Sequence, residues 1–193
     1  MDTINAVIND LVNYLESVGV VGGFFLVILE AIFPILPLAV FIGMNILAFG
    51  NVVGFIVSYI ATITGCMASF CLFKFTLNNF VYRVLNKKTK TKIDKLMIKL
   101  RNIDFNALVI IHAMPFTPSF LINIAGGLSG MNSKKYFISL LIGKLSIIYF
   151  WGYVGKNILS AIKEPIVVLK MLGLVVLAYL ISKIIEKIIK VEE

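Results

Sequence analysis

An apolar segment between Arg101 and Lys134 limits the folds open to this chain more than any other feature. Basic residues flank it at both ends, and Pro115 and Pro118 interrupt it. Basic residues beside membrane segments favour the cytoplasmic side of the membrane. A single crossing would place one of the two basic ends on the opposite side, against this rule. Two crossings would need ~40 apolar residues, and only 32 residues lie between the two ends. Residues 104–131 are therefore predicted to form a re-entrant hairpin of two half-helices.

The first half of the chain contains a matching interrupted segment. In both segments a polar residue precedes Pro-x-x-Pro, and asparagine and glycine follow. The matched residues are Glu30, Pro34, Pro37, Gly43 and Asn45 in the first segment, and His112, Pro115, Pro118, Asn123, Gly126 and Gly127 in the second. Such pairs in two halves of a membrane protein indicate an inverted repeat with a binding site at mid-bilayer. Residues 18–50 are predicted to form the other re-entrant hairpin, although two proline-kinked spans that merely look alike are the alternative.

Composition assigns the chain to the membrane. Hydrophobic residues make up 60% of the 193 residues and charged residues 15%, whereas soluble domains are about 45–50% apolar. The net charge of +8 comes mainly from lysines at segment ends and in one loop. That placement indicates orientation in an anionic membrane and not nucleic-acid binding. The predicted fold is a single all-α integral membrane domain over residues 1–193.

The remaining segments complete the predicted topology. Residues 3–17 carry an apolar stripe opposite polar residues, which is typical of an interfacial amphipathic helix. Transmembrane helices are predicted at 51–75, 136–153 and 165–185, and a basic cytoplasmic loop at 83–101. The lysines near the C-terminus place that end in the cytoplasm too, with the protein in the cell membrane.

The basic loop has a helical pattern of its own. Its apolar residues share one face between the lysines, and they are Ile93, Leu96, Met97 and Leu100. This pattern is typical of a helix lying on an anionic surface, and a solvated connector is the alternative.

Five polar residues within apolar segments are candidates for a substrate path or a proton site: Glu30, His112, Lys144, Asn45 and Asn123. A carboxylate at the position of Glu30 is costly in lipid, so we expect it to exchange a proton or to contact a cationic headgroup. The alternative is an interfacial carboxylate that caps a half-helix. Lys144 either snorkels to the interface or faces a cavity as a phosphate contact.

The other candidates also have structural alternatives. His112 either titrates near neutrality or bonds backbone groups freed by Pro115. Asn45 and Asn123 either line a polar path or satisfy backbone groups at the hairpin tips. Trp151 and its neighbouring tyrosines are typical of an interfacial aromatic belt. The sequence contains no metal-ligand cluster and no nucleophile–base pair, so we expect no catalytic residue, no metal, no cofactor and no enzyme.

These motifs resemble the VTT-domain superfamily, which includes bacterial DedA proteins and eukaryotic SNARE-associated Golgi proteins. The resemblance runs from about Gly22 to Lys156, and PFTPSFLINIAGGLSGM at 115–131 is its most specific part. It implies two opposed re-entrant hairpins and movement of phospholipid or polyprenyl-phosphate carriers between leaflets. The DedA pattern has arginines at the positions of His112 and Pro118, and this departure favours the VTT branch outside DedA.

The function predicted from the sequence is a scramblase-like or flippase-like lipid translocator. Its expected partners are membrane lipids, either phospholipid or undecaprenyl phosphate. The alternatives are a proton-linked transporter of ions or small solutes, and a membrane-organising structural protein without transport. Small residues along the 51–75 span permit a homo-oligomer without requiring one.

Overall fold

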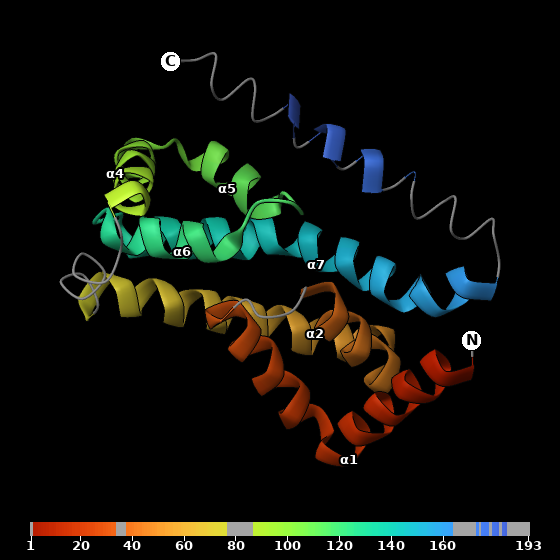
Figure 1. Ribbon diagram of the computed structural model, residues 1–193. Coiled ribbons are helices and arrows are strands. Elements are labelled where there is room, and N and C mark those ends of the chain that lie inside the picture. Colours follow the sequence, from red (N-terminus) through yellow and green to blue (C-terminus); the bar gives the residue numbers. More distant parts are fainter. Residues whose placement is uncertain are drawn as a thin grey trace.

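The computed structural model describes residues 2–33, 38–76 and 87–163, together with parts of 173–184. Every regular element within these ranges is a helix (Figure 1). Three helices among the described residues are long and apolar enough to cross a membrane, namely Val12–Ile32, Leu38–Phe75 and Ser133–Gly155. The predicted class, an all-α membrane protein, is confirmed.

The helices form layers. Their bounds are α1 (Asp2–Ile32), α2 (Leu38–Phe75), α4 (Lys87–Asn102), α5 (Phe105–Ala113), α6 (Ser119–Leu128) and α7 (Ser133–Lys163). Helix α2 packs against α1 on one side and against α6 and α7 on the other, and α5 packs on α7 (Figure 1). Helix α4 packs on α6 near the C-terminal end of α2.

Two glycines divide the first two helices. Gly19 in α1 has φ 72° and Gly50 in α2 has φ 80°. Positive φ is readily adopted only by glycine, so each position breaks its helix. The helical arms before and after residues 34–37, namely 20–32 and 38–49, are each roughly 20 Å long at 1.5 Å per residue. Residues 51–75 then form a continuous helix long enough to span a bilayer.

The second hairpin has shorter arms. Asp104 caps α5, because its Oδ2 accepts a hydrogen bond from the Asn106 N–H at 2.8 Å. Helix α5 ends before Pro115, and α6 begins directly after Pro118. Each arm is roughly 15 Å long, about half the ~30 Å hydrocarbon thickness of a bilayer. The Lys135 ammonium donates to the Ile103 carbonyl, so the two ends of this hairpin lie together.

Both halves use one packing scheme for the first arm of each hairpin. A Cβ at Gly65 of α2 would lie 2.6 Å from the Cβ of Ala31 on α1. A Cβ at Gly143 of α7 would lie 2.5 Å from the Cβ of His112 on α5. In each case a glycine of the long helix allows close approach of the hairpin arm that precedes it in the chain.

The second arm of each hairpin packs against the long helix of the other half. Gly43, on the first part of α2, meets Gly155 of α7, where an added Cβ would lie 2.8 Å from the Gly155 Cα. Gly127 of α6 meets Phe70 of α2, where an added Cβ would lie 2.6 Å from the carbonyl oxygen. The two halves therefore interlock, and each hairpin is held between both long helices.

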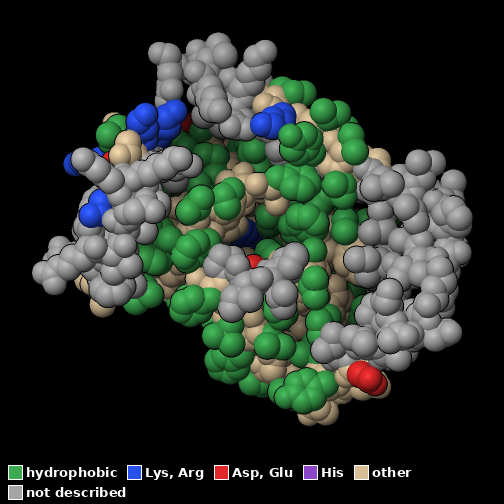
Figure 2. Space-filling model, in the orientation of Figure 1, with side chains coloured by type: hydrophobic (Ala, Val, Ile, Leu, Met, Phe, Trp, Pro, Cys, Tyr) green, Lys and Arg blue, Asp and Glu red, His purple; other side chains and the backbone are tan. Residues whose placement is uncertain are grey.

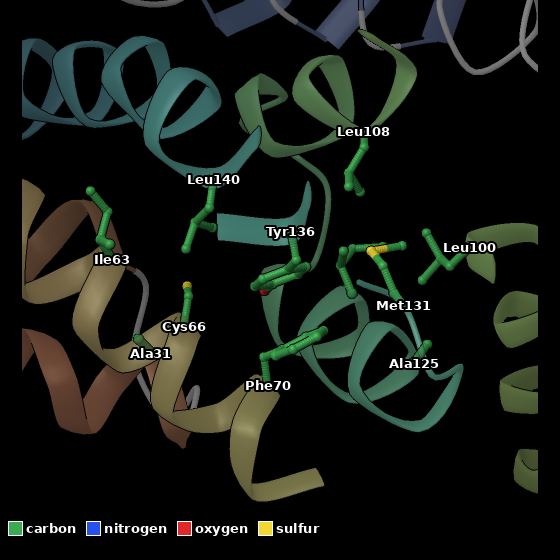
Figure 3. Close-up of a cluster of buried hydrophobic side chains, with 11 residues drawn as sticks. Ala31, Ile63, Cys66, Phe70, Leu100, Leu108, Ala125, Met131, Tyr136 and Leu140 are labelled. Atoms are coloured by element: carbon green, nitrogen blue, oxygen red, sulfur yellow. The ribbon is translucent and has the colours of Figure 1, made fainter. Parts of the chain in front are cut away.

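The largest hydrophobic cluster lies where α2, α6 and α7 meet (Figure 3). Phe70 and Tyr136 stack at its centre, with ring centroids 4.1 Å apart. Its buried members are Ala31, Ile63, Cys66, Phe70, Leu100, Leu108, Ile122, Ala125, Met131, Tyr136 and Leu140. Because Leu100 comes from α4 and Leu108 from α5, this cluster joins the basic helix to the second hairpin.

Some elements differ in extent from their prediction. The segment predicted as a basic loop is helical from Lys87 onward, and residues 83–86 lie outside the described residues. The span predicted at 136–153 continues to Lys163, because no proline interrupts the chain before Pro165. Most of the predicted span at 165–185, and both Pro34 and Pro37, also lie outside the described residues.

Candidate functional site

A cavity of about 350 Å³ lies where the two hairpins meet. Residues of both hairpins and of both long helices line it. They are Glu30, Ala31, Leu38 and Ala39 of the first hairpin, Pro115, Thr117, Pro118, Ser119, Phe120 and Leu121 of the second, Thr62 and Cys66 of α2, and Lys144, Ile147 and Trp151 of α7. Figure 2 shows a hollow in a hydrophobic face, with basic side-chain atoms inside it and acidic atoms beside them. The charged residues of the lining are Lys144 and Glu30.

Lys144 forms one wall of the cavity. It lies about 17 Å along α7 from Ser133, near the middle of a helix long enough to span the membrane. Its side chain is 0% exposed, and its Nζ donates a hydrogen bond to the Ser119 Oγ at 2.7 Å. The lysine therefore points across to the second hairpin instead of snorkelling toward the end of its helix.

Ser119 also marks the start of α6. The N-cap residue is Pro118, which has no side chain that can bond the first N–H groups of the helix. The N-terminus of a helix carries a partial positive charge. This end of α6 and the Lys144 ammonium consequently give one side of the cavity positive character.

Glu30 also lines the cavity, in the last turn of α1. Its side chain is partly buried among apolar neighbours such as Ala31 and Leu38. A carboxylate and an ammonium within one cavity compensate each other electrostatically, which lowers the cost of placing both charges in lipid. The arrangement can accept an anionic group near Lys144 and a cationic group near Glu30.

Comparison with known proteins assigns the chain to a family. Residues 14–157, more than half of the sequence, match the model of the VTT domain. The chain belongs to the VTT-domain family. It is similar to the uncharacterized membrane protein YhjE of Bacillus subtilis (strain 168), with 29% identity over 81% of this chain and 75% of that protein. It is also similar to the uncharacterized protein YqeD of the same strain, with 24% identity over 70% of this chain and 64% of that protein. No solved structure matches it significantly.

In this VTT-domain protein His112 lies outside the cavity lining. Its side chain is buried between α5 and α7, close to Gly143. The ring meets Tyr136 edge-on, with centroids 5.1 Å apart. The Nε2 atom has no hydrogen-bond partner among the described residues. Of the two matched polar residues, Glu30 and His112, the structure therefore brings only Glu30 to the cavity.

The two asparagines are buried within the VTT domain, and neither lines the cavity. The Asn45 Nδ2 donates to the Ser58 Oγ at 3.0 Å and to the Gly23 carbonyl at 3.4 Å. These bonds join both arms of the first hairpin to the part of α2 that follows Gly50. The Asn123 Oδ1 accepts a hydrogen bond from the Tyr136 hydroxyl, which joins α6 to α7. Both asparagines thus make contacts between helices.

The motif residues of the second hairpin divide into two groups. Pro115 and Pro118 line the cavity at the turn. Gly126 and Gly127 are buried farther along α6, against α2. An added Cβ at Gly126 would make ordinary contacts of 3.5 Å, whereas at Gly127 it would meet backbone. The prolines shape the turn, and Gly127 allows close packing of the VTT-domain helices.

Several cavity residues, among them Thr62, Cys66, Trp151 and Ser119, were not among the predicted site residues. Thr62 and Cys66 are four residues apart on one face of α2, and this i, i+4 spacing was the available signal. Trp151, predicted to belong to an aromatic belt, lines the cavity and lies edge-on to Phe116, with centroids 6.0 Å apart. Ser119, which begins α6 directly after Pro118, accepts a hydrogen bond from Lys144.

Proposed function

We propose that this protein is a lipid translocator, in which a phosphate-bearing headgroup crosses through the cavity while the lipid tails stay in the bilayer. The observation that carries this proposal is Lys144. A charged side chain in a membrane helix is costly, and such residues mark substrate or ion pathways. Here the charge is fully buried, and its hydrogen-bond acceptor is a neutral hydroxyl.

A phosphate group matches the donors on this side of the cavity. The Lys144 ammonium provides a point charge, and the Ser119 hydroxyl provides another hydrogen bond. The first N–H groups of α6 add the partial positive charge that favours phosphate at helix N-termini. Half-helix ends of this kind bind anionic substrate groups in membrane transporters.

The family resemblance adds a second argument. The DedA pattern has an arginine at the position that Pro118 occupies in this chain. Lys144, reaching from α7 to Ser119, provides a cation at the same turn.

The hairpin dimensions support a shortened route across the membrane. Each arm of the second hairpin is about half a bilayer long, and the two ends of the hairpin lie together at Ile103 and Lys135. We infer that both hairpins are re-entrant and enter from opposite leaflets, so that the cavity lies between them. The hollow opens in a hydrophobic face (Figure 2), where the tails of a lipid would remain in the membrane.

A leaflet-exchange assay tests the function. The purified protein is reconstituted into vesicles with a fluorescent phospholipid or with an undecaprenyl-phosphate reporter. We expect faster exchange of at least one of these lipids than in protein-free vesicles. Lys144→Met keeps a side chain of similar shape but removes the charge, so we expect it to slow exchange at least tenfold. This loss corresponds to one charge-assisted hydrogen bond, or about 1.5–3 kcal/mol.

Lys134→Met is the matched control, because Lys134 is exposed at the start of α7 and away from the cavity. It should exchange lipid at the wild-type rate. Exchange of both lipids at the protein-free rate would rule out the proposal. Equal exchange rates for Lys144→Met and wild type would show that Lys144 does not contact the lipid during exchange.

A further inference from the structure

The basic helix α4 has an inner face that is anchored to the protein. Leu100 is 1% exposed and belongs to the largest hydrophobic cluster, the one around Phe70 and Tyr136, called the central cluster below. Met97 is partly buried against the same cluster and against the neighbouring one formed by Phe73, Ile124 and Leu128. These two apolar side chains therefore face the protein, and a lipid surface can meet only the opposite side of the helix.

The outer face of α4 combines cations with one apolar side chain. Lys95, Lys99 and Arg101 are all exposed. Ile98 is 69% exposed and lies among them, three residues from Lys95 and from Arg101. Figure 2 shows basic side chains gathered over the end of the molecule where Figure 1 places α4. Asp94 is the single acidic residue of the helix and is less exposed than these cations.

This face lies at one end of the long helices. The Lys74 ammonium, near the end of α2, donates to the Met131 carbonyl at 2.7 Å and to the Ser133 hydroxyl at 2.9 Å. The end of α2 and the start of α7 therefore meet there. Met131 shares the central cluster with Leu100 of α4. The basic face thus lies beside the end of the apolar helices, where a bilayer crossed by these helices would have its headgroups.

We propose that the outer face of α4 binds the headgroups of anionic phospholipids in the adjoining leaflet. Lys95, Lys99 and Arg101 would contact the phosphates, and Ile98 would enter the boundary between headgroups and acyl chains. An exposed isoleucine among cations at this level matches a lipid surface better than a nucleic acid, which offers no apolar layer. The surface is separate from the cavity and does not depend on lipid translocation.

A fluorescence experiment on the full-length protein tests this binding. Cys66 and Cys71 are replaced by alanine, and Ile98→Cys carries an environment-sensitive fluorophore. The protein is reconstituted in phosphatidylcholine vesicles with or without phosphatidylglycerol. We expect a blue shift and protection from an aqueous quencher only with phosphatidylglycerol. Salt at about 0.5 M on both sides should reverse both effects, because it screens charge interactions.

A charge variant and a matched control make the test specific. Lys95→Gln, Lys99→Gln and Arg101→Gln together should lower the affinity of this face for phosphatidylglycerol about a hundredfold and so remove the blue shift. Lys134→Gln, which removes an exposed lysine outside α4, should leave the response intact. The proposal is overturned by equal spectra in both vesicle types, by a shift that survives in the triple variant, or by a response to an added oligonucleotide in place of phosphatidylglycerol. Because the readout requires no lipid exchange, it can succeed or fail independently of the proposed function.

Discussion

At the residue scale, the main feature is a pair of oppositely charged side chains, Lys144 and Glu30, in one apolar cavity. Each charge is costly in an apolar environment, and each lines the same cavity. The hydroxyl that accepts from Lys144 at 2.7 Å carries no charge, so Glu30 and a bound anionic group are the charges in the cavity that can compensate the ammonium. A zwitterionic headgroup would complement both residues, with its phosphate near Lys144 and its ammonium near Glu30. A polyprenyl phosphate has no ammonium group, so it would complement only Lys144.

Glu30→Gln should therefore separate the two lipid classes. We expect the variant to slow exchange of a phospholipid with an ammonium headgroup, because the amide carries no charge to attract it. Exchange of undecaprenyl phosphate should stay within about twofold of wild type, a difference below 0.5 kcal/mol. The measurement compares both lipids in one vesicle preparation, with the unfolding temperature in detergent as a check on folding. Equal slowing of both lipids would contradict a headgroup contact at Glu30.

At the element scale, the hairpin arms depend on glycine contacts. Helices this short are marginal by themselves, so packing must hold them in place. Four glycines of the long helices and hairpin arms, Gly43, Gly65, Gly127 and Gly143, approach a neighbouring helix too closely for an unstrained Cβ. These crossings therefore require small residues, since helices associate in membranes mainly through close packing. Gly43 and Gly127 are the two of the four that interlock the halves of the chain.

Gly43→Leu should separate the first hairpin from α7. The new side chain would meet the backbone of Gly155, which cannot move aside as a flexible side chain could. We expect a loss of about 1–3 kcal/mol in unfolding free energy, typical of overpacking. Ala68→Leu on the exposed face of the same helix is the control and should have little effect. Unfolding by denaturant in detergent measures both, and equal stability of the two variants would show that the crossing tolerates bulk.

At the scale of the whole molecule, three basic groups lie at one end. Lys74 contacts the start of α7, Lys135 contacts the segment between α4 and α5, and α4 packs beside them. Chain segments that lie before and after the second hairpin thus emerge together. Under the positive-inside rule this end should face the cytoplasm.

Cysteine labelling tests this topology. Single cysteines at Lys88, Lys134 and Lys163 are introduced in a protein in which Cys66 and Cys71 are replaced by alanine. An impermeant thiol reagent added to whole cells should label position 163 and spare positions 88 and 134, because the long helix α7 separates its two ends by a bilayer. Labelling at 134 together with protection at 88 would mean that the second hairpin crosses the membrane.

The sequence by itself determined the class of the protein, its family motifs and the places where its helices are interrupted. Hydropathy and proline position are local properties, so the breaks before Pro115 and after Pro118 could be predicted from neighbouring residues alone. The tertiary structure decided which polar residues share a cavity. His112 occupies the position that matches Glu30, yet it packs against Gly143 and Tyr136, while Lys144 reaches Ser119 from another helix. Contacts between distant helices depend on how closely their surfaces approach, and no pattern along one segment records that distance.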